Sequence, residues 1–209
     1  MASRSANSGS CSLCGHRASK TKMAAHLVTC ITSHGAAGSA QALTTFRVDA
    51  AHDPKYWVFV EARSDAAIRG LDAFLRDLWL ECCGHLSAFF IDRREVPMGA
   101  PAGKAFGPVG ARFRYEYDFG STTALVGQVV GSRHGSIGRA PVRLLARNDP
   151  PAFSCARCAE IATNVCPYCL GDEESLFCDT HAAEHEHARE EVYLPVVNSP
   201  RIGVCGYTR

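Results

Sequence analysis

Hydrophobic positions in the middle of the chain recur mostly at the spacing of β-strands. The clearest case runs from Arg112 to Phe119, where aromatic residues alternate with charged residues as on a half-buried strand. The pair Gly120-Ser121 then indicates a turn into a hairpin partner. Five segments read as strands, and a sixth can add an edge strand: residues 44–50, 56–62, 87–92, 112–119, 122–130 and, at the edge, 142–146.

One segment has the spacing of a helix instead. Between residues 65 and 81 the apolar side chains fall three and four residues apart, on one face of an amphipathic helix. Ser64 and Asp65 are typical N-cap residues, and Gly84 closes the segment. One long helix among mostly sequential strands predicts an α+β domain, in which the helix packs on an antiparallel sheet.

The composition is that of an ordinary globular protein, apart from its cysteines. The 209 residues are 46% hydrophobic and 21% charged. Residues 1–10 lack the apolar stretch of a signal peptide, and no apolar run approaches the length of a membrane span. Eleven cysteines with C-x2-C pairs and interleaved histidines are more typical of metal binding in a reducing compartment than of disulfides. We therefore expect a cytoplasmic protein without a membrane partner.

Composition and charge change together along the chain and predict separate units. These are a disordered lead (1–10), a zinc finger (11–31), a small-residue linker (32–41), the α+β domain (42–148) and a zinc-rich region with its tail (149–209). The first 40 residues carry four Lys/Arg and no acid, whereas residues 149–209 carry four Lys/Arg and ten Asp/Glu. The basic end suits a phosphate backbone, which would repel the acidic end.

The first candidate metal site lies near the N-terminus. Cys11, Cys14, His26 and Cys30 have the spacing of a four-ligand zinc site. His26 and Cys30 are four residues apart and would lie on one face of a helix. The segment resembles a small ββα zinc finger, with Met23 and Leu27 as its core. So short a unit has almost no other means of folding.

The second candidate set holds eight ligands, enough for two tetrahedral zinc ions. They are Cys155, Cys158, Cys166, Cys169, Cys178, His181, His185 and His187. In a cross-brace, Cys155, Cys158, Cys178 and His181 would share one zinc, and Cys166, Cys169, His185 and His187 the other. In a sequential arrangement, the first four ligands would share one zinc and the last four the other.

The residues give an argument for each pairing. Cys178, His181 and His185 fall on one face of a helix, which favours the sequential form. His187 lies on a different helical face from His185, which favours the cross-brace. We favour the cross-brace, whose order resembles that of B-box-type fingers. With the N-terminal finger, the chain is expected to bind three zinc ions, all in closed sites with no position for a substrate.

Three motifs in the middle domain resemble one known family. They are Trp79-Leu80-Glu81, Cys82-Cys83-Gly84-His85-Leu86-Ser87-Ala88-Phe89 and Tyr115-Glu116-Tyr117-Asp118-Phe119-Gly120. Together they are similar to the plasmid pRiA-type ORF-three-like family, also labelled an insertion-element passenger protein, over roughly residues 44–146. The tail from Leu194 to Tyr207 is similar to a branch with a zinc-rich C-terminus, in which the last ligand pair is usually His-x-Cys. Here it is His185-x-His187, and zinc accepts either residue. The resemblance implies a fold more than an activity.

Other polar residues are assigned structural roles. Cys82, Cys83 and His85 lie at a helix end, where a buried cysteine serves as a small apolar residue, and Cys205 is also assigned a structural role. Asp118 is expected to satisfy backbone groups of the hairpin turn. We find no catalytic constellation, no phosphate-binding loop and no small-molecule site.

Three functions compete. The sequence favours a non-enzymatic, zinc-stabilised interaction or scaffold protein with a protein partner, associated with a mobile genetic element through the family resemblance. The alternative is a nucleic-acid-binding accessory protein that uses the finger residues Arg17, Lys20 and Lys22. An enzyme such as a recombinase is a distant third, because it needs a positioned nucleophile among clustered arginines.

Overall fold

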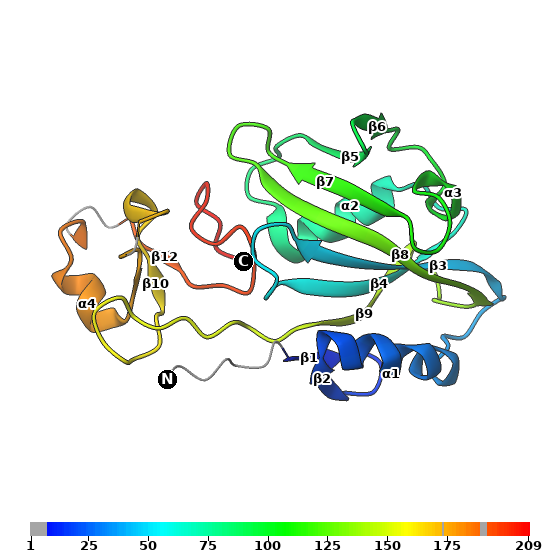
Figure 1. Cartoon of the computed structure of the whole chain (residues 1–209), viewed down its shortest axis with the longest axis horizontal. Coiled ribbons are helices and arrows are strands. Elements are labelled where there is room, and N and C mark those ends of the chain that lie inside the picture. The colour runs from blue at the N-terminus through cyan, green and yellow to red at the C-terminus, as the bar shows by residue number, and fades with distance from the viewer. Residues whose placement is uncertain (1–7, 173, 189–191) are drawn as a thin grey trace.

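The computed structural model describes residues 8–172, 174–188 and 192–209, in two lobes of unequal size (Figure 1). The large lobe is built on a nine-stranded sheet in the order β2-β1-β9-β4-β3-β8-β7-β5-β6, and every neighbouring pair is antiparallel. Its strands are β1 (Ser8–Cys11), β2 (Arg17–Ser19), β3 (Gln41–Ala50), β4 (Trp57–Arg63), β5 (Ser87–Ile91), β6 (Arg94–Val96), β7 (Arg112–Tyr117), β8 (Thr123–Gly135) and β9 (Val142–Asn148). The predicted α+β class with an antiparallel sheet is confirmed.

Helices cover both faces of this sheet, because each strand presents alternate side chains to opposite faces. On one face, Val58 and Val60 pack with α2 (Arg69–Leu75) and the π-helical turn η1 (Arg76–Leu80). On the other face, Trp57 and Phe59 pack with α1 (Lys20–Ser33). The short helix α3 (Ala102–Ala105) lies in the Gly/Pro-rich loop before β7. The sheet thus separates two hydrophobic cores.

The main helix begins later than the sequence predicts. α2 starts at Arg69 rather than near residue 65, because the residues before it pair with another segment. The amide of Ile68 donates to the carbonyl of Ala100 (2.9 Å), and Ala67 forms a β-bridge with Pro101. Ser64, the expected cap residue, instead shares a hydrogen bond with Thr44 (2.8 Å). Tertiary pairing overrides the local cap signal.

The predicted alternation of residues 112–119 is wrong at its end. Tyr115 and Tyr117 are buried as expected, but Phe119 is 53% exposed and Asp118 is 6% exposed. Asp118 adopts a left-handed backbone with φ of 64°. This conformation ends the strand and reverses the directions of the two side chains that follow Tyr117.

The N-terminal finger joins the sheet. β1 pairs with β9, so that β9 lies inside the sheet rather than at its edge as expected. Residues 8–10, assigned by composition to the disordered lead, form most of β1; residues 1–7 of that lead lie outside the described part. Gly9 makes this pairing possible, since a Cβ there would collide with the ring of Trp57 and the carbonyl of Arg147.

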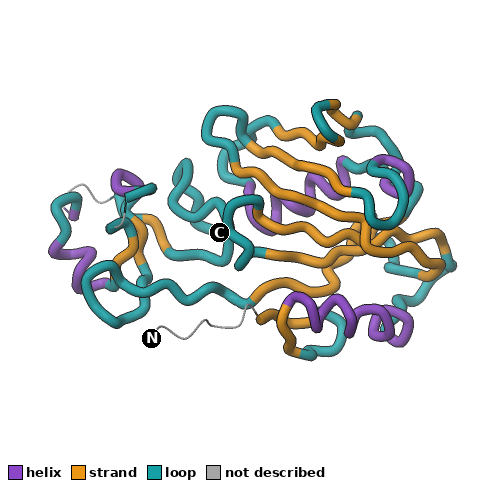
Figure 2. The backbone as a smooth tube through the Cα atoms, in the orientation of Figure 1, coloured by secondary structure: helices purple, strands orange, loops and turns teal. Residues whose placement is uncertain are grey.

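The small lobe follows β9 and consists largely of loops (Figure 2). It holds a three-stranded sheet in the order β11-β10-β12, and α4 lies beside it. Its elements are β10 (Asn164–Val165), the 3₁₀ turn η2 (Pro167–Cys169), β11 (Leu176–Phe177), α4 (Asp179–Glu184) and β12 (Leu194–Pro195). After β12 the chain returns to the large lobe, where the side chain of Asn198 accepts a hydrogen bond from Asn148 (2.7 Å). Among the described residues, no helix is long and apolar enough to span a membrane.

Candidate metal centres

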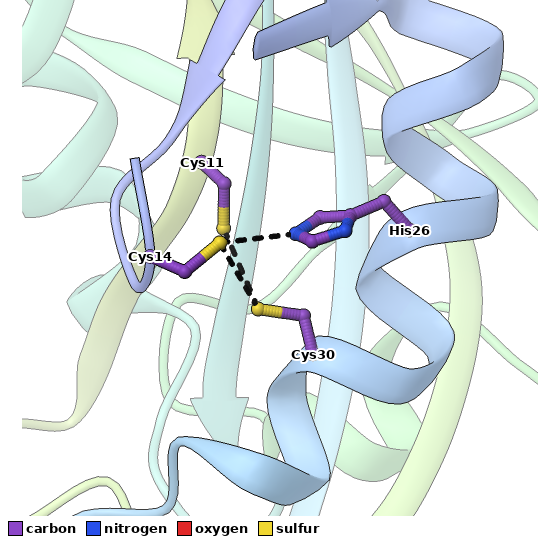
Figure 3. A group of neighbouring side chains, drawn as sticks. All are labelled: Cys11, Cys14, His26 and Cys30. Atoms are coloured by element: carbon purple, nitrogen blue, oxygen red, sulfur yellow. Dashed lines mark hydrogen bonds between the residues drawn. The ribbon is translucent and has the colours of Figure 1, made fainter. Parts of the chain in front are cut away.

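A tight turn and a helix bring the N-terminal ligands together (Figure 3). The amide of Gly15 donates to the carbonyl of Cys11 (2.9 Å), and Gly15 takes a φ of 76°, so the chain folds back between Cys11 and Cys14. His26 and Cys30 project toward this turn from successive turns of α1. The four ligand atoms lie within 4.8 Å of one another.

The spacing of the ligand atoms in this finger matches a tetrahedron around one ion. Zinc–sulfur bonds of about 2.3 Å give a sulfur–sulfur edge of roughly 3.8 Å. The Cys30 sulfur lies 3.8 Å from that of Cys11 and 3.6 Å from that of Cys14. The Cys14 sulfur lies 3.3 Å from Nε2 of His26. These distances are far longer than a disulfide bond of about 2.05 Å, so the finger can hold a metal ion.

The electrostatics of the finger favour a bound cation. Burial, with the hydrogen bonds that the Cys30 thiol makes to Cys14 and Cys11, raises the pKa of Cys30 to about 12. The backbone amide of His16 lowers the pKa of Cys14. Zinc ligation requires thiolates, and a buried thiolate needs a compensating positive charge.

The eight C-terminal ligands form two groups in interleaved order. One group is Cys155, Cys158, Cys178 and His181, and the other is Cys166, Cys169, His185 and His187. In the first, the sulfurs of Cys158 and Cys178 lie 3.8 Å apart, and Nδ1 of His181 lies 3.3 Å from Cys178. In the second, Nε2 of His185 and Nδ1 of His187 lie 3.3 and 3.5 Å from Cys169. This is the arrangement of a cross-brace.

The end of α4 explains why the order is interleaved. The helix carries His181 but stops at Glu184, and His185 has the extended backbone angles φ −75° and ψ 151°. The chain then turns at residues 186–188, where the amide of Ala188 donates to the carbonyl of His185 (2.9 Å). This turn brings His185 and His187 into one ligand group, whereas a continued helix would have sent them to different faces.

The two C-terminal groups contain one thiol with a lowered pKa and one with a raised pKa. Burial opposes ionisation of Cys155, but hydrogen bonds from the amides of Cys178 and Arg157, together with those from Cys158, outweigh it and lower the pKa of Cys155 to about 6. The Arg157 amide lies 3.4 Å from the Cys155 sulfur. Burial and the neighbouring Cys166 raise the pKa of Cys169 to about 11. Both groups have ligands that zinc accepts, at distances that suit it.

A fourth group was missed by the sequence analysis. Cys82, Cys83, His85 and Cys205 also place their ligand atoms within 4.8 Å of one another. The Cys83 sulfur lies 3.8 Å from that of Cys82 and 3.7 Å from that of Cys205. Three of these residues adjoin in sequence, but the fourth is 120 positions away from His85, and spacing rules test only local patterns. Cys83 and Cys205 are exposed, so the role of small apolar core residues does not suit them.

Asp118 binds the turn and the C-terminal segment. As expected, its carboxylate accepts hydrogen bonds from the amides of Gly120 and Ser121 (3.0 and 3.2 Å). It also pairs with the buried guanidinium of Arg201 (2.6 Å). Arg201, more than any other group, lowers the pKa of Asp118, to about 2. The carboxylate is therefore a structural anion at neutral pH.

Two basic residues of the finger form ion pairs within the chain. Arg17 pairs with Asp149 (2.8 Å) and Lys20 with Asp49 (2.9 Å). Lys22 is exposed. Two of the three cations proposed for nucleic-acid contact thus already have carboxylate partners.

Comparisons with known proteins give no functional assignment. No family model matches this chain, and no curated protein matches it. Among solved structures it is similar to that of the protein of unknown function MM3350 from Methanosarcina mazei Go1. The TM-score is 0.41 with 11% sequence identity, over 51% of this chain and 68% of that chain.

Proposed function

We propose that this chain is a cytoplasmic, zinc-stabilised interaction or scaffold protein without enzymatic activity. The observation that carries the proposal is the number of protein ligands in each predicted site. The finger group and both C-terminal groups each offer four Cys or His ligands. Four protein ligands complete the tetrahedral shell of zinc, whereas catalytic zinc sites keep a position for water or substrate.

The small lobe offers the surface for a protein partner. Three of its large apolar side chains are exposed: Ile161, Tyr168 and Leu170. The region 149–209 also carries ten acidic residues against four basic ones. Exposed apolar side chains on an acidic lobe suit a partner with a basic, partly apolar surface.

Nucleic-acid binding by the finger has less support. The ion pairs of Arg17 and Lys20 compete with phosphate contacts, and the apolar face of α1 is occupied by the sheet. The resemblance to the pRiA-type ORF-three-like family adds an association with a mobile genetic element to the proposal, and this part rests on the sequence motifs alone.

A binding comparison tests the proposed function. Proteins crosslinked to the full chain would be compared with those crosslinked to Ile161→Asp, in the small lobe, and to Val109→Asp, an equally exposed site in the large lobe. We expect a specific partner to be lost only with Ile161→Asp. Equal partner profiles for all three proteins would contradict the proposed surface.

A mobility-shift titration in increasing salt tests the alternative function. Tight, salt-sensitive binding that weakens in a Lys20→Ala/Lys22→Ala double variant would instead assign the finger to nucleic acid.

A further inference from the structure

We propose that Cys82, Cys83, His85 and Cys205 bind a further Zn²⁺ ion, and that this ion fastens the C-terminal segment to the large lobe. The first three ligands lie between η1 and β5, and the fourth lies near the end of the chain. We call this group the clasp. It lies outside the three sites expected from the sequence.

The geometry of the clasp fits a thiophilic ion. Its sulfur–sulfur distances of 3.8 and 3.7 Å equal the tetrahedral edge of about 3.8 Å expected for zinc. Nε2 of His85 lies 3.1 Å from the Cys83 sulfur and 3.2 Å from that of Cys205. None of the sulfur pairs is close enough for a disulfide. Three sulfurs and one imidazole nitrogen are a ligand set of structural zinc sites.

The backbone directs the ligands of the clasp toward one point. Gly84, between Cys83 and His85, has a φ of 84°, which glycine adopts without strain. Cys205 has a φ of 52°, a conformation uncommon for a residue with a Cβ. Gly206, at φ 67°, continues the left-handed turn. This turn brings the thiol of Cys205 to within reach of Cys83.

A buried ion pair lies beside the clasp. Three thiolates and a neutral imidazole around Zn²⁺ carry one net negative charge. Arg201 is fully buried nearby, with its guanidinium 4.9 Å from the ring centre of Tyr117. The hydroxyl of Tyr117 lies 3.8 Å from the Cys82 sulfur. Asp118 binds Arg201 (2.6 Å) and lies 3.5 Å from Nε2 of His85, so this ion pair adds no net charge, and the case for the clasp rests on its ligand geometry.

The clasp ends a segment that contacts both lobes. The hydroxyl of Ser199 donates to the carbonyl of Trp79 (2.5 Å), and Arg201 donates to the hydroxyl of Thr123 (3.0 Å). Gly203 lies against Leu170 of the small lobe so closely that a Cβ would lie 2.7 Å from that side chain. An ion that fixes Cys205 therefore holds this segment, and through it the small lobe, against the sheet.

Exposure distinguishes the clasp from the other groups. Cys83 and Cys205 are both exposed, whereas each of the other three groups contains at least one buried cysteine. A chelator reaches exposed ligands first. We expect the clasp ion to leave before the others, and the C-terminal segment to loosen when it does.

The test combines metal counting with protection of the C-terminal segment, using the full chain loaded with Zn²⁺. Native mass spectrometry should count four zinc ions in the wild type and three in Cys205→Ser. Hydrogen exchange should rise in residues 199–207 of that variant. Cys14→Ser is the matched control: it should also lose one zinc, from the finger, without faster exchange in residues 199–207.

A second variant separates loss of the ligand from disturbance of the fold. Cys205→His keeps a zinc ligand and should restore both the fourth ion and the protection. Three zinc ions in both the wild type and Cys205→Ser would overturn the clasp site. Loss of one ion in Cys205→Ser with unchanged exchange would overturn its fastening role. Neither result bears on the three sites of the proposed function.

Discussion

The contact between α1 and the sheet can be tested at two neighbouring residues, Leu27 and Val28. Leu27 is 4% exposed and belongs to the core that contains Trp57 and Phe59, whereas Val28 is 71% exposed. Leu27→Ala removes three carbon atoms, at about 0.8 kcal/mol for each buried methylene, so the transfer loss is roughly 2.4 kcal/mol. Val28→Ala should change stability by less than about 0.5 kcal/mol.

The loss of unfolding free energy in Leu27→Ala depends on whether the space left by the side chain stays empty. Leucine-to-alanine substitutions in closed cores cost about 3–5 kcal/mol, because a cavity remains. Leu27 also lines an open groove between α1 and the sheet, with Val28, Ile31 and Val130 among its walls. Water and side chains can fill the space there, so the cavity penalty is small. We expect a loss of about 2.5–3 kcal/mol, or roughly 5–10 °C in melting temperature at this chain length.

Urea unfolding in the presence of zinc measures this loss, followed by tryptophan fluorescence. The chain has two tryptophans, and they report on opposite faces of the sheet: Trp57 lies in the core under α1 and Trp79 in the core under α2. If the finger were a separate unit behind a linker, Leu27→Ala would not move the transition of the sheet. Equal midpoints for Leu27→Ala and Val28→Ala would refute the packing described here.

Three further changes have defined outcomes. Glu61→Gln should cost about 3–5 kcal/mol in urea unfolding, because the buried carboxylate holds Arg133 and Arg143 at 2.6 and 2.8 Å and the amide leaves both cations without a counter-charge. Phe119→Ser should leave the melting temperature within about 2 °C of wild type, whereas Phe113→Ala, in the core, should lose about 3–5 kcal/mol; equal effects would contradict the break in alternation. Excess zinc chelator should raise hydrogen exchange throughout the small lobe while the central strands stay protected, and a small lobe that remained protected without metal would be contrary to expectation.

How far the sequence predicts this molecule depends on how local each signal is. The strands and the C-x2-C pairs are local patterns, and the structure contains them where expected. The cap signal predicts a start of α2 near residue 65, but the helix starts at Arg69. The reason is that Ala67 and Ile68 pair with residues more than 30 positions away, which no local pattern reveals. The segment before Cys11 reads as disordered, since Ser and Gly carry no hydrophobic pattern. It forms a strand only because β9 and Trp57 accept a glycine at position 9.

The ligand group of the clasp also could not be predicted from local sequence patterns. Cys82, Cys83 and His85 form an incomplete ligand set by themselves, and their position at a helix end favours a packing role. Their fourth member, Cys205, comes close only after the small lobe has formed and the chain has returned along Trp79 and Thr123. No spacing rule covers such a distance, so the group became visible only in three dimensions.

The small lobe differs from the large one in what its interior is made of. Its buried cluster consists of Cys155, Cys166, Cys169, Phe177 and Ala182. Three of these five residues are candidate ligands, and only one is a large apolar side chain. Such an interior buries too little apolar surface to offset the entropy of ordering the chain. We therefore expect metal binding to supply most of the folding free energy of this lobe. On this expectation the surface that contains Ile161 and Leu170 forms only when metal is bound, and partner binding should depend on zinc even if the partner does not contact the ion.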